Sequence, residues 1–154
     1  MALRFSTGLR NALLGNSGAS PATGDGLGGT LEGCYIDIYS GAPPANADAA
    51  PIGTKLATVS INGEGDTGLT FAAPSAGTVA KTAAENWKGI GVAVGVAGWF
   101  RVRTTADDNQ SGTTYPRIDG TVAKTGADLN MSNTSVTVGS PHTIDTFTLT
   151  MPAS

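Results

Sequence analysis

The stretch GIGVAVGVAG at residues 89–98 alternates strictly between aliphatic side chains and small residues. Successive side chains of a β-strand point to opposite faces, so one face carries the isoleucine and the valines and the other carries only glycine and alanine. A face with almost no side chains lets another backbone approach closely. The pattern therefore predicts a β-strand that packs against a second sheet or a neighbouring subunit.

The seven residues that follow, WFRVRTT, keep the period of two. Phe100 and Val102 fall on the face predicted to point inward. Trp99, Arg101 and Arg103 fall on the outward face. An arginine beside an aromatic ring can stack on it and also pair with carboxylates, features that are favoured at protein interfaces. Two interpretations stay open for this outward face, a solvated strand surface and an interface with a partner chain.

The composition suits short strands joined by many turns. The chain has 154 residues, which is most simply one domain, with 22 glycines, 8 prolines and only 14% charged residues. A formal net charge of -3 argues against an electrostatic nucleic-acid binder, which would carry a basic excess. Since no apolar run approaches the ~18 residues of a membrane span, the sequence predicts no membrane partner.

Further segments along the chain also alternate, and turn signals separate them. Asn62-Gly63 suits a tight hairpin turn between two of them. The segment 78–88 fits either a helix or a strand, and its strand neighbours favour a strand. Roughly eight strands at this spacing predict an all-β fold, either an antiparallel β-sandwich or a jelly-roll-like barrel. The other segments predicted as strands are 33–40, 55–61, 68–73, 117–124, 127–132, 134–139 and 143–151.

The N-terminus predicts a short helical arm. Ser6 or Thr7 can cap a helix of about two turns that ends near Gly15, and such a helix must dock on its own domain or on a neighbour. The glycine-rich segment 15–30 predicts an extended linker. We therefore expect an N-terminal arm at 1–30 and a β-sandwich domain at 31–154. The candidate protein-interface residues are Leu3, Phe5, Leu9, Leu13, Trp99, Arg101 and Arg103.

Residues with catalytic or metal-binding chemistry are sparse. Cys34 is the only cysteine, so it can form neither an intramolecular disulfide nor a cysteine-based zinc site, and a buried strand position is expected for it. His142 is the only histidine and follows a proline, which predicts an ordinary loop residue. The segment DDNQSG at 107–112 offers half of a calcium-loop pattern, but its residues are also typical of a hairpin tip. We expect no enzyme activity, no cofactor and no metal.

Five segments, taken in order, resemble small virion proteins of tailed bacteriophages: LRFSTGLRNALL, GCYIDIYSGAPPANADAAPIGTKLATVSI, GLTFAAPSAGTVAKTAAENWKGIGVAVGVAGWFRVR, RIDGTVAKTGADLNMSNTSVTVG and IDTFTLTMPAS. The resemblance covers nearly the whole chain and is one of overall pattern. It implies a capsid decoration or cement protein, which is β-rich, clamps adjacent capsomers and has no catalytic residues. The implied location is the virion, the implied partners are the major capsid protein or other virion proteins, and a homo-oligomer is expected.

A tail or receptor-binding module that recognises a host surface glycan is the alternative. In that case Tyr35, Tyr39 and Trp87 could form a platform on which sugar rings stack, although aromatic residues on strands are more often packed inside. An enzyme is the third hypothesis.

Overall fold

The computed structural model describes residues 3–15 and 26–151, which form an all-β domain with two short helices. The predicted all-β class is confirmed, and the strands pair into largely antiparallel, sandwich-like sheets. The jelly-roll alternative stays a prediction. The elements are β1 (Arg4–Phe5), α1 (Thr7–Leu13), α2 (Gly26–Thr30), β2 (Tyr35–Ser40), β3 (Lys55–Ile61), β4 (Thr78–Ala80), β5 (Trp87–Gly91), β6 (Gly95–Arg103), β7 (Arg117–Ala123), β8 (Leu129–Asn130), β9 (Ser135–Val136), β10 (Pro141–Ile144) and β11 (Thr148–Thr150).

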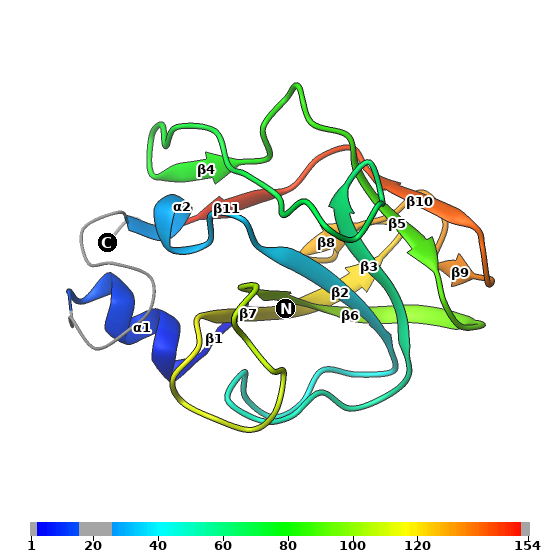
Figure 1. Ribbon diagram of the computed structural model, residues 1–154, viewed down its shortest axis with the longest axis horizontal. Coiled ribbons are helices and arrows are strands. Elements are labelled where there is room, and N and C mark those ends of the chain that lie inside the picture. Colours follow the sequence, from blue (N-terminus) through cyan, green and yellow to red (C-terminus); the bar gives the residue numbers. More distant parts are fainter. Residues whose placement is uncertain (1–2, 16–25, 152–154) are drawn as a thin grey trace.

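Most of the strands belong to one large sheet (Figure 1). Its hydrogen-bonded order is β1-β7-β6-β2-β3-β5-β10, with β8 beside β7 and β9 beside β6. The neighbours are antiparallel except β7 and β8, which are parallel. The long strand β6 carries the second half of the alternating stretch and lies between β2 and β7. This central position fixes which of its side chains point into the core.

The core lies between this sheet and a two-stranded sheet formed by β4 and β11. Phe100 and Val102 are fully buried in it, as their inward phase predicts. The ring of Phe147, just before β11, packs edge-on against Phe100 at 5.6 Å between centroids and lies 5.9 Å from Trp87. Burial raises the pKa of the Cys34 thiol, which is consistent with an unreactive core cysteine.

The N-terminal helix is confirmed, and it docks on its own domain. β1 pairs with β7, and the side chain of Leu9 is buried in the core. Ser6 caps α1, because its hydroxyl oxygen accepts the Leu9 N–H at 3.1 Å. The same hydroxyl oxygen accepts the Arg117 N–H at 2.9 Å and donates its proton to the carbonyl of Tyr115 at 2.9 Å. One side chain therefore caps the helix and ties it to β7.

The predicted linker is wrong over its last five residues. Gly26–Thr30 forms α2, and Thr30 and the following Leu31 are buried. Glycine is a poor helix former, so the helix here depends on tertiary packing, which sequence periodicity does not reveal. Residues 16–25 of the predicted linker lie outside the described residues.

Two predictions about hairpins have different outcomes. The segment 68–73 makes only isolated bridges, at Leu69 and Phe71, and β3 pairs with β2 and β5 instead of with it. The turn at Asn62-Gly63 does form, with positive φ angles of 57° and 77°. The segment 78–88 is not helical. It contains β4 and the start of β5, so the strand prediction is confirmed at its two ends, while residues 81–86 form a connection outside these strands.

Candidate functional site

Charged residues alternate across neighbouring strands on the outward face of the large sheet. Asp37 on β2 lies directly opposite Arg101 on β6, which in turn lies opposite Asp119 on β7. All three side chains are fully buried. Charges buried in this way must be paired, because removing one partner leaves an uncompensated charge away from water.

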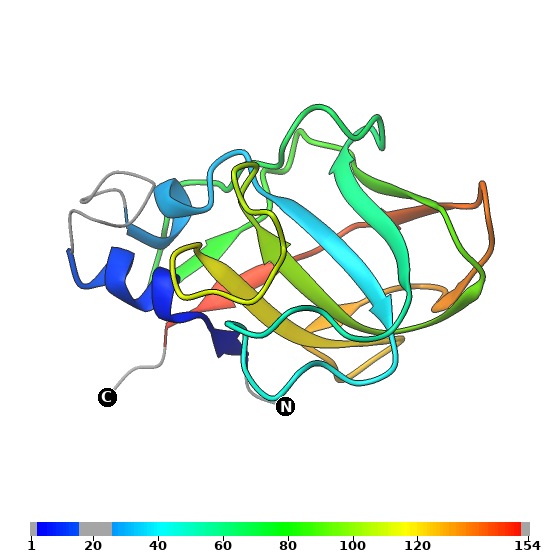
Figure 2. The same cartoon turned by 60° about the horizontal axis from the view of Figure 1, so that its bottom comes forward.

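Two loops cover this face. In the loop after β2, the carbonyl of Ile52 accepts a hydrogen bond of 3.1 Å from the indole N–H of Trp99. The loop after β6 lies beside it (Figure 2), and the N–H of Gly112 donates to the carbonyl of Asp48 at 2.8 Å. The outward face of WFRVRTT is therefore interior at Trp99 and Arg101, while Arg103 stays partly exposed.

The Arg101–Asp119 pair is bidentate. The guanidinium Nε and Nη2 atoms donate to the two carboxylate oxygens at 2.7 Å and 2.8 Å, and the guanidinium carbon lies 5.6 Å from the centre of the Trp99 ring. Burial raises the pKa of Asp119, while the hydrogen bonds and charge of Arg101 act in the opposite direction. This geometry lets one arginine satisfy a buried carboxylate and also contact an aromatic ring.

Asp37 is the centre of a second group of contacts. Its carboxylate accepts hydrogen bonds from Arg103 Nε at 2.7 Å and from the Thr58 hydroxyl at 2.6 Å. The amide of Asn109 donates to the same carboxylate at 3.3 Å and to the hydroxyl of Tyr39 at 2.7 Å. Burial, followed by the charge of Asp37, raises the pKa of Tyr39 to about 12. The loop residue Asn109 thus ties the loop to β2.

A third ion pair anchors the segment DDNQSG. Arg117 donates from Nε and Nη2 to the two carboxylate oxygens of Asp107, and both side chains are buried. The same carboxylate accepts the N–H of Asn109 at 2.7 Å, and Asn109 has a positive φ of 62°. The turn interpretation of this segment is confirmed. Among residues 3–15 and 26–151, no three histidine, cysteine or acidic side chains are grouped where they could hold a metal ion.

The interface prediction needs correction at three residues. Leu9, Trp99 and Arg101 are 0% exposed, so they offer no surface to a partner. Leu9 belongs to the core. Trp99 and Arg101 are covered by the two loops, and Asp119 pairs with Arg101. Leu3, Phe5, Leu13 and Arg103 are partly exposed, and an interface role for them stays a prediction.

His142 is not arranged as a general base. It lies in β10 instead of in the predicted loop, is 8% exposed, and its Nε2 lies 2.9 Å from the hydroxyl oxygen of Ser140. That hydroxyl donates its proton to the carbonyl of Thr137 at 2.6 Å. The imidazole must then donate to the serine oxygen, so it cannot take the serine proton in this arrangement.

The predicted sugar platform is also internal. Tyr35, Tyr39 and Trp87 are all buried. Tyr39 stacks on Trp99 with 4.4 Å between ring centroids. These rings therefore present no face on which a glycan could stack.

Four exposed valines gather at one end of the molecule, and we call this surface the valine end. The turn between β5 and β6 and the turn between β9 and β10 both lie at this end (Figure 1). Hydrogen bonds of 2.8 Å join Gly91 to Gly139 and to Ser140 across these turns. The valines are Val92, Val94, Val96 and Val138, with exposed fractions between 60% and 73%.

The backbone under the valine end is tightly packed. A Cβ atom on Gly91 would lie 2.1 Å from the carbonyl oxygen of Thr137, and one on Gly95 would lie 2.8 Å from the side chain of Leu56. The predicted close approach to the glycine face is therefore confirmed, and residues of the same chain make it. Because that face is filled internally, the valine side chains are left pointing to solvent.

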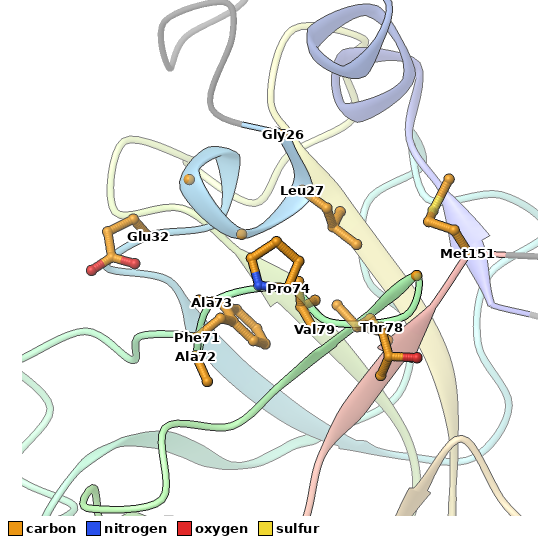
Figure 3. A pocket seen from close by; sticks show the side chains of 14 residues that line it. Gly26, Leu27, Glu32, Phe71, Ala72, Ala73, Pro74, Thr78, Val79 and Met151 are labelled. Atoms are coloured by element: carbon orange, nitrogen blue, oxygen red, sulfur yellow. The ribbon is translucent and has the colours of Figure 1, made fainter.

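An apolar groove of about 380 Å³ lies between α2, the segment before β4, and β11 (Figure 3). These elements lie at the end of the molecule opposite the valine end (Figure 1). Glu32 stands at its edge, with its carboxylate directed away from the apolar side chains. The apolar side chains that line the groove are Leu27, Phe71, Pro74, Val79, Leu149 and Met151.

Comparison of the chain with protein-family models, curated proteins and solved structures finds no match. The resemblance to virion proteins therefore stays a prediction. No helix within the described residues has the length and apolar character needed to cross a membrane.

Proposed function

We propose that this chain is a structural component of a tailed-phage virion, a capsid decoration or cement protein that binds the lattice of the major capsid protein. The observation that carries the proposal is the valine end. Exposed apolar residues scattered singly are ordinary, but a group of them on adjoining turns marks a surface for protein contact. The resemblance of the sequence to virion proteins supplies the class of partner.

Internal contacts that hold the loops and strands together support a binding role. The Arg117–Asp107 pair holds the loop after β6 against the sheet. The hydrogen bond from the Trp99 indole to Ile52 holds the loop after β2. The Arg101–Asp119 and Arg103–Asp37 pairs join neighbouring strands under these loops. The glycine contacts described above hold the turns of the valine end in place. A preformed surface loses little conformational entropy on binding, which favours attachment to a repeating lattice.

The way the polar side chains are used favours a non-catalytic role. The buried arginine and aspartate side chains are used in structural pairs, and the hydroxyl proton of Ser140 is used in a backbone hydrogen bond. A decoration protein needs a stable scaffold and an adhesive surface, which is the combination found here.

The valine end gives a direct test. We expect Val94→Asp and Val138→Asp to fold normally but to lose most of their binding to undecorated capsids of the encoding phage, because a carboxylate placed in an apolar contact must be desolvated. Thr148→Asp is the matched control, since this exposed residue lies on β11, away from the valine end. Co-sedimentation with capsids measures the bound fraction, and thermal unfolding of the free variants checks the fold.

Quantitative mass spectrometry of purified virions tests the function itself. A copy number comparable with that of the major capsid protein supports a decoration role. A much lower copy number would move the proposal to a tail component, and absence from the virion would refute it. Normal capsid binding by both aspartate variants would leave the function standing but would exclude the valine end as the contact.

A further inference from the structure

We propose that the apolar groove receives the end of helix α1 of a second copy of this chain, with Leu14 inserted into the groove and Arg10 paired with Glu32. This contact joins copies to each other and is separate from the valine end. The argument rests on exposure, spacing, charge and position of the described residues.

Leu14 is the apolar side chain that the fold leaves most exposed among the described large hydrophobic residues, at 85%. It follows the last residue of α1, and its N–H donates to the carbonyl of Arg10 at 3.0 Å, so the helical turn continues to this position. The preceding Leu13 is half-buried against the core, which fixes the helix end and makes Leu14 a projecting side chain.

The groove has the complementary character. Its volume of about 380 Å³ exceeds that of one leucine side chain, and Leu27, Phe71 and Met151 give it apolar walls. Part of its wall is formed by glycines of α2, which leave room where side chains would otherwise stand. Inserting an aliphatic side chain would remove apolar surface from water on both partners.

The charges beside the two surfaces are also complementary. Arg10 lies one helical turn before Leu14, so the two side chains share one face of the helix. Glu32 lies at the edge of the groove. No ion pair joins either residue to another charged residue within the described part of the chain. A helix end that places leucine in the groove brings its arginine toward this carboxylate.

The position of the two surfaces favours a second copy as the occupant. α1 and α2 lie at the same end of the molecule (Figure 1), so a two-fold axis at this end would let each copy insert its Leu14 into the groove of the other. Such an arrangement closes after two copies and forms the contact twice. The basic and apolar end of α1 is complementary in charge and polarity to a groove with an acidic edge.

The test uses analytical ultracentrifugation of the full chain over a range of concentrations. We expect a reversible dimer. Leu14→Asp removes the inserted side chain, and Gly28→Leu fills the groove, because a Cβ at Gly28 already lies 3.9 Å from Val79 and the backbone there is unstrained. Each variant should weaken the dimer at least about tenfold, the effect expected from losing a buried leucine. Gly112→Leu is the matched control, since nothing lies within 4 Å of its Cβ position.

Mixing the two variants gives the decisive measurement. Leu14→Asp keeps an open groove and Gly28→Leu keeps its leucine, so an equimolar mixture forms one intact contact and should associate more tightly than either variant alone. In a second series, Arg10→Glu and Glu32→Arg should each weaken the dimer about two- to fivefold, and the double variant should recover the wild-type affinity. Circular dichroism and thermal unfolding confirm that each variant folds.

Four results would overturn the proposal. The first is a wild-type chain that stays monomeric at all concentrations, and the second is a mixture that associates no better than its components. The third is a loss of association in Val138→Asp as large as in Leu14→Asp, which would place the contact at the valine end. The fourth is a small apolar molecule that native mass spectrometry finds on monomeric wild-type protein but not on Gly28→Leu, which would make the groove a ligand site.

Discussion

Replacing Arg101 by methionine is expected to destabilise the domain strongly. Methionine fills similar space without charge, so the change removes the two hydrogen bonds, of 2.7 Å and 2.8 Å, that the guanidinium donates to Asp119. The carboxylate is then left buried without its main partner. Breaking a buried ion pair at one side costs about 3–5 kcal/mol. Typical domains have a free energy of unfolding of about 5–15 kcal/mol, so the loss is a large share of the total.

Urea unfolding followed by tryptophan fluorescence measures this loss, and a double-mutant cycle separates the pair from its surroundings. Asp119→Asn should also be destabilising, because it leaves a buried guanidinium facing a neutral amide. The double variant should lose less than the sum of the single changes, by about 0.5–3 kcal/mol. Lys55→Met is the matched control. Its amine lies 3.6 Å from Asp37 and its side chain is 44% exposed, so this change should cost less than about 1 kcal/mol.

The pH dependence has a definite sign. Burial raises the pKa of Asp119 in the folded state, so the folded protein binds this proton more tightly than the unfolded chain does. Stability from this group is therefore greatest at acid pH and falls as the pH rises from about 3.9, the unfolded value, through the folded pKa. Removing the positive charge of Arg101 raises the folded pKa further. The destabilisation by Arg101→Met should therefore be larger at pH 7 than at pH 5.

Two results would refute this reasoning. The first is an Arg101→Met variant that unfolds at the same urea concentration as Lys55→Met. The loops would then not cover the outward face of β6 in solution, and Arg101 would lie on a solvated strand surface. The second is strict additivity of the single and double variants, which would mean that Arg101 and Asp119 do not interact, whatever their burial.

Three further predictions use thermal unfolding. Phe100→Ala should lower the free energy of unfolding by about 3–5 kcal/mol, because it leaves a cavity in the core, and a loss below about 1 kcal/mol would contradict the inward assignment. Gly91→Ala should lower the free energy of unfolding by about 1–3 kcal/mol or more, because the new Cβ would lie 2.1 Å from the carbonyl oxygen of Thr137. Gly112→Ala is the control and should be nearly neutral, because nothing lies within 4 Å of its Cβ position. Calcium should leave the melting temperature unchanged, because Asp107 is already paired with an arginine, and a rise reversed by a chelator would show that the turn binds the ion.

The period of two in WFRVRTT made part of the core predictable. Phe100 and Val102 share one phase of this pattern and are fully buried. The same phase was no guide to burial in the preceding stretch, because Val92, Val94 and Val96 are 60–73% exposed. The glycine face was predictable for a related reason, because a face without side chains implies a close neighbour. Which segment would supply the neighbour was not predictable, since nothing local to Gly91 points to Thr137.

The burial of the other face of β6, which carries Trp99 and Arg101, was not predicted, although the sequence holds a signal for it. Asp37 and Asp119 each follow an isoleucine in a strand, and their phase is opposite to that of the core residues. Two acidic residues and Arg101 on the same face of neighbouring strands suggest internal pairing instead of a solvated surface. The covering loops carry no such pattern, because their prolines and glycines are chosen for turns and their contacts come from distant parts of the chain.

Helix α2 was missed for the opposite reason. Its sequence, Gly-Leu-Gly-Gly-Thr, has a low helix propensity because three of its five residues are glycine, and a single leucine gives no periodicity. The helix depends on the burial of its last residue, Thr30, and of the following Leu31, which is a tertiary effect. The groove beside it was therefore also invisible in the sequence, since it depends on how α2 sits over β4 and β11.

The distribution of charge limits where this domain can meet other proteins. Three of its nine basic residues and three of its twelve acidic residues are used in pairs under the loops. The loops cover Trp99 and Arg101 on that face, so the contacts proposed above use the two ends of the molecule. One end presents four exposed valines, an apolar surface that fits an apolar patch on another protein. The other presents an arginine and a leucine beside a groove with an acidic edge, which match each other and hence a second copy. Under the two proposals, the domain binds a lattice with one end and a copy of itself with the other, and such bridging would reinforce a particle without any catalytic group.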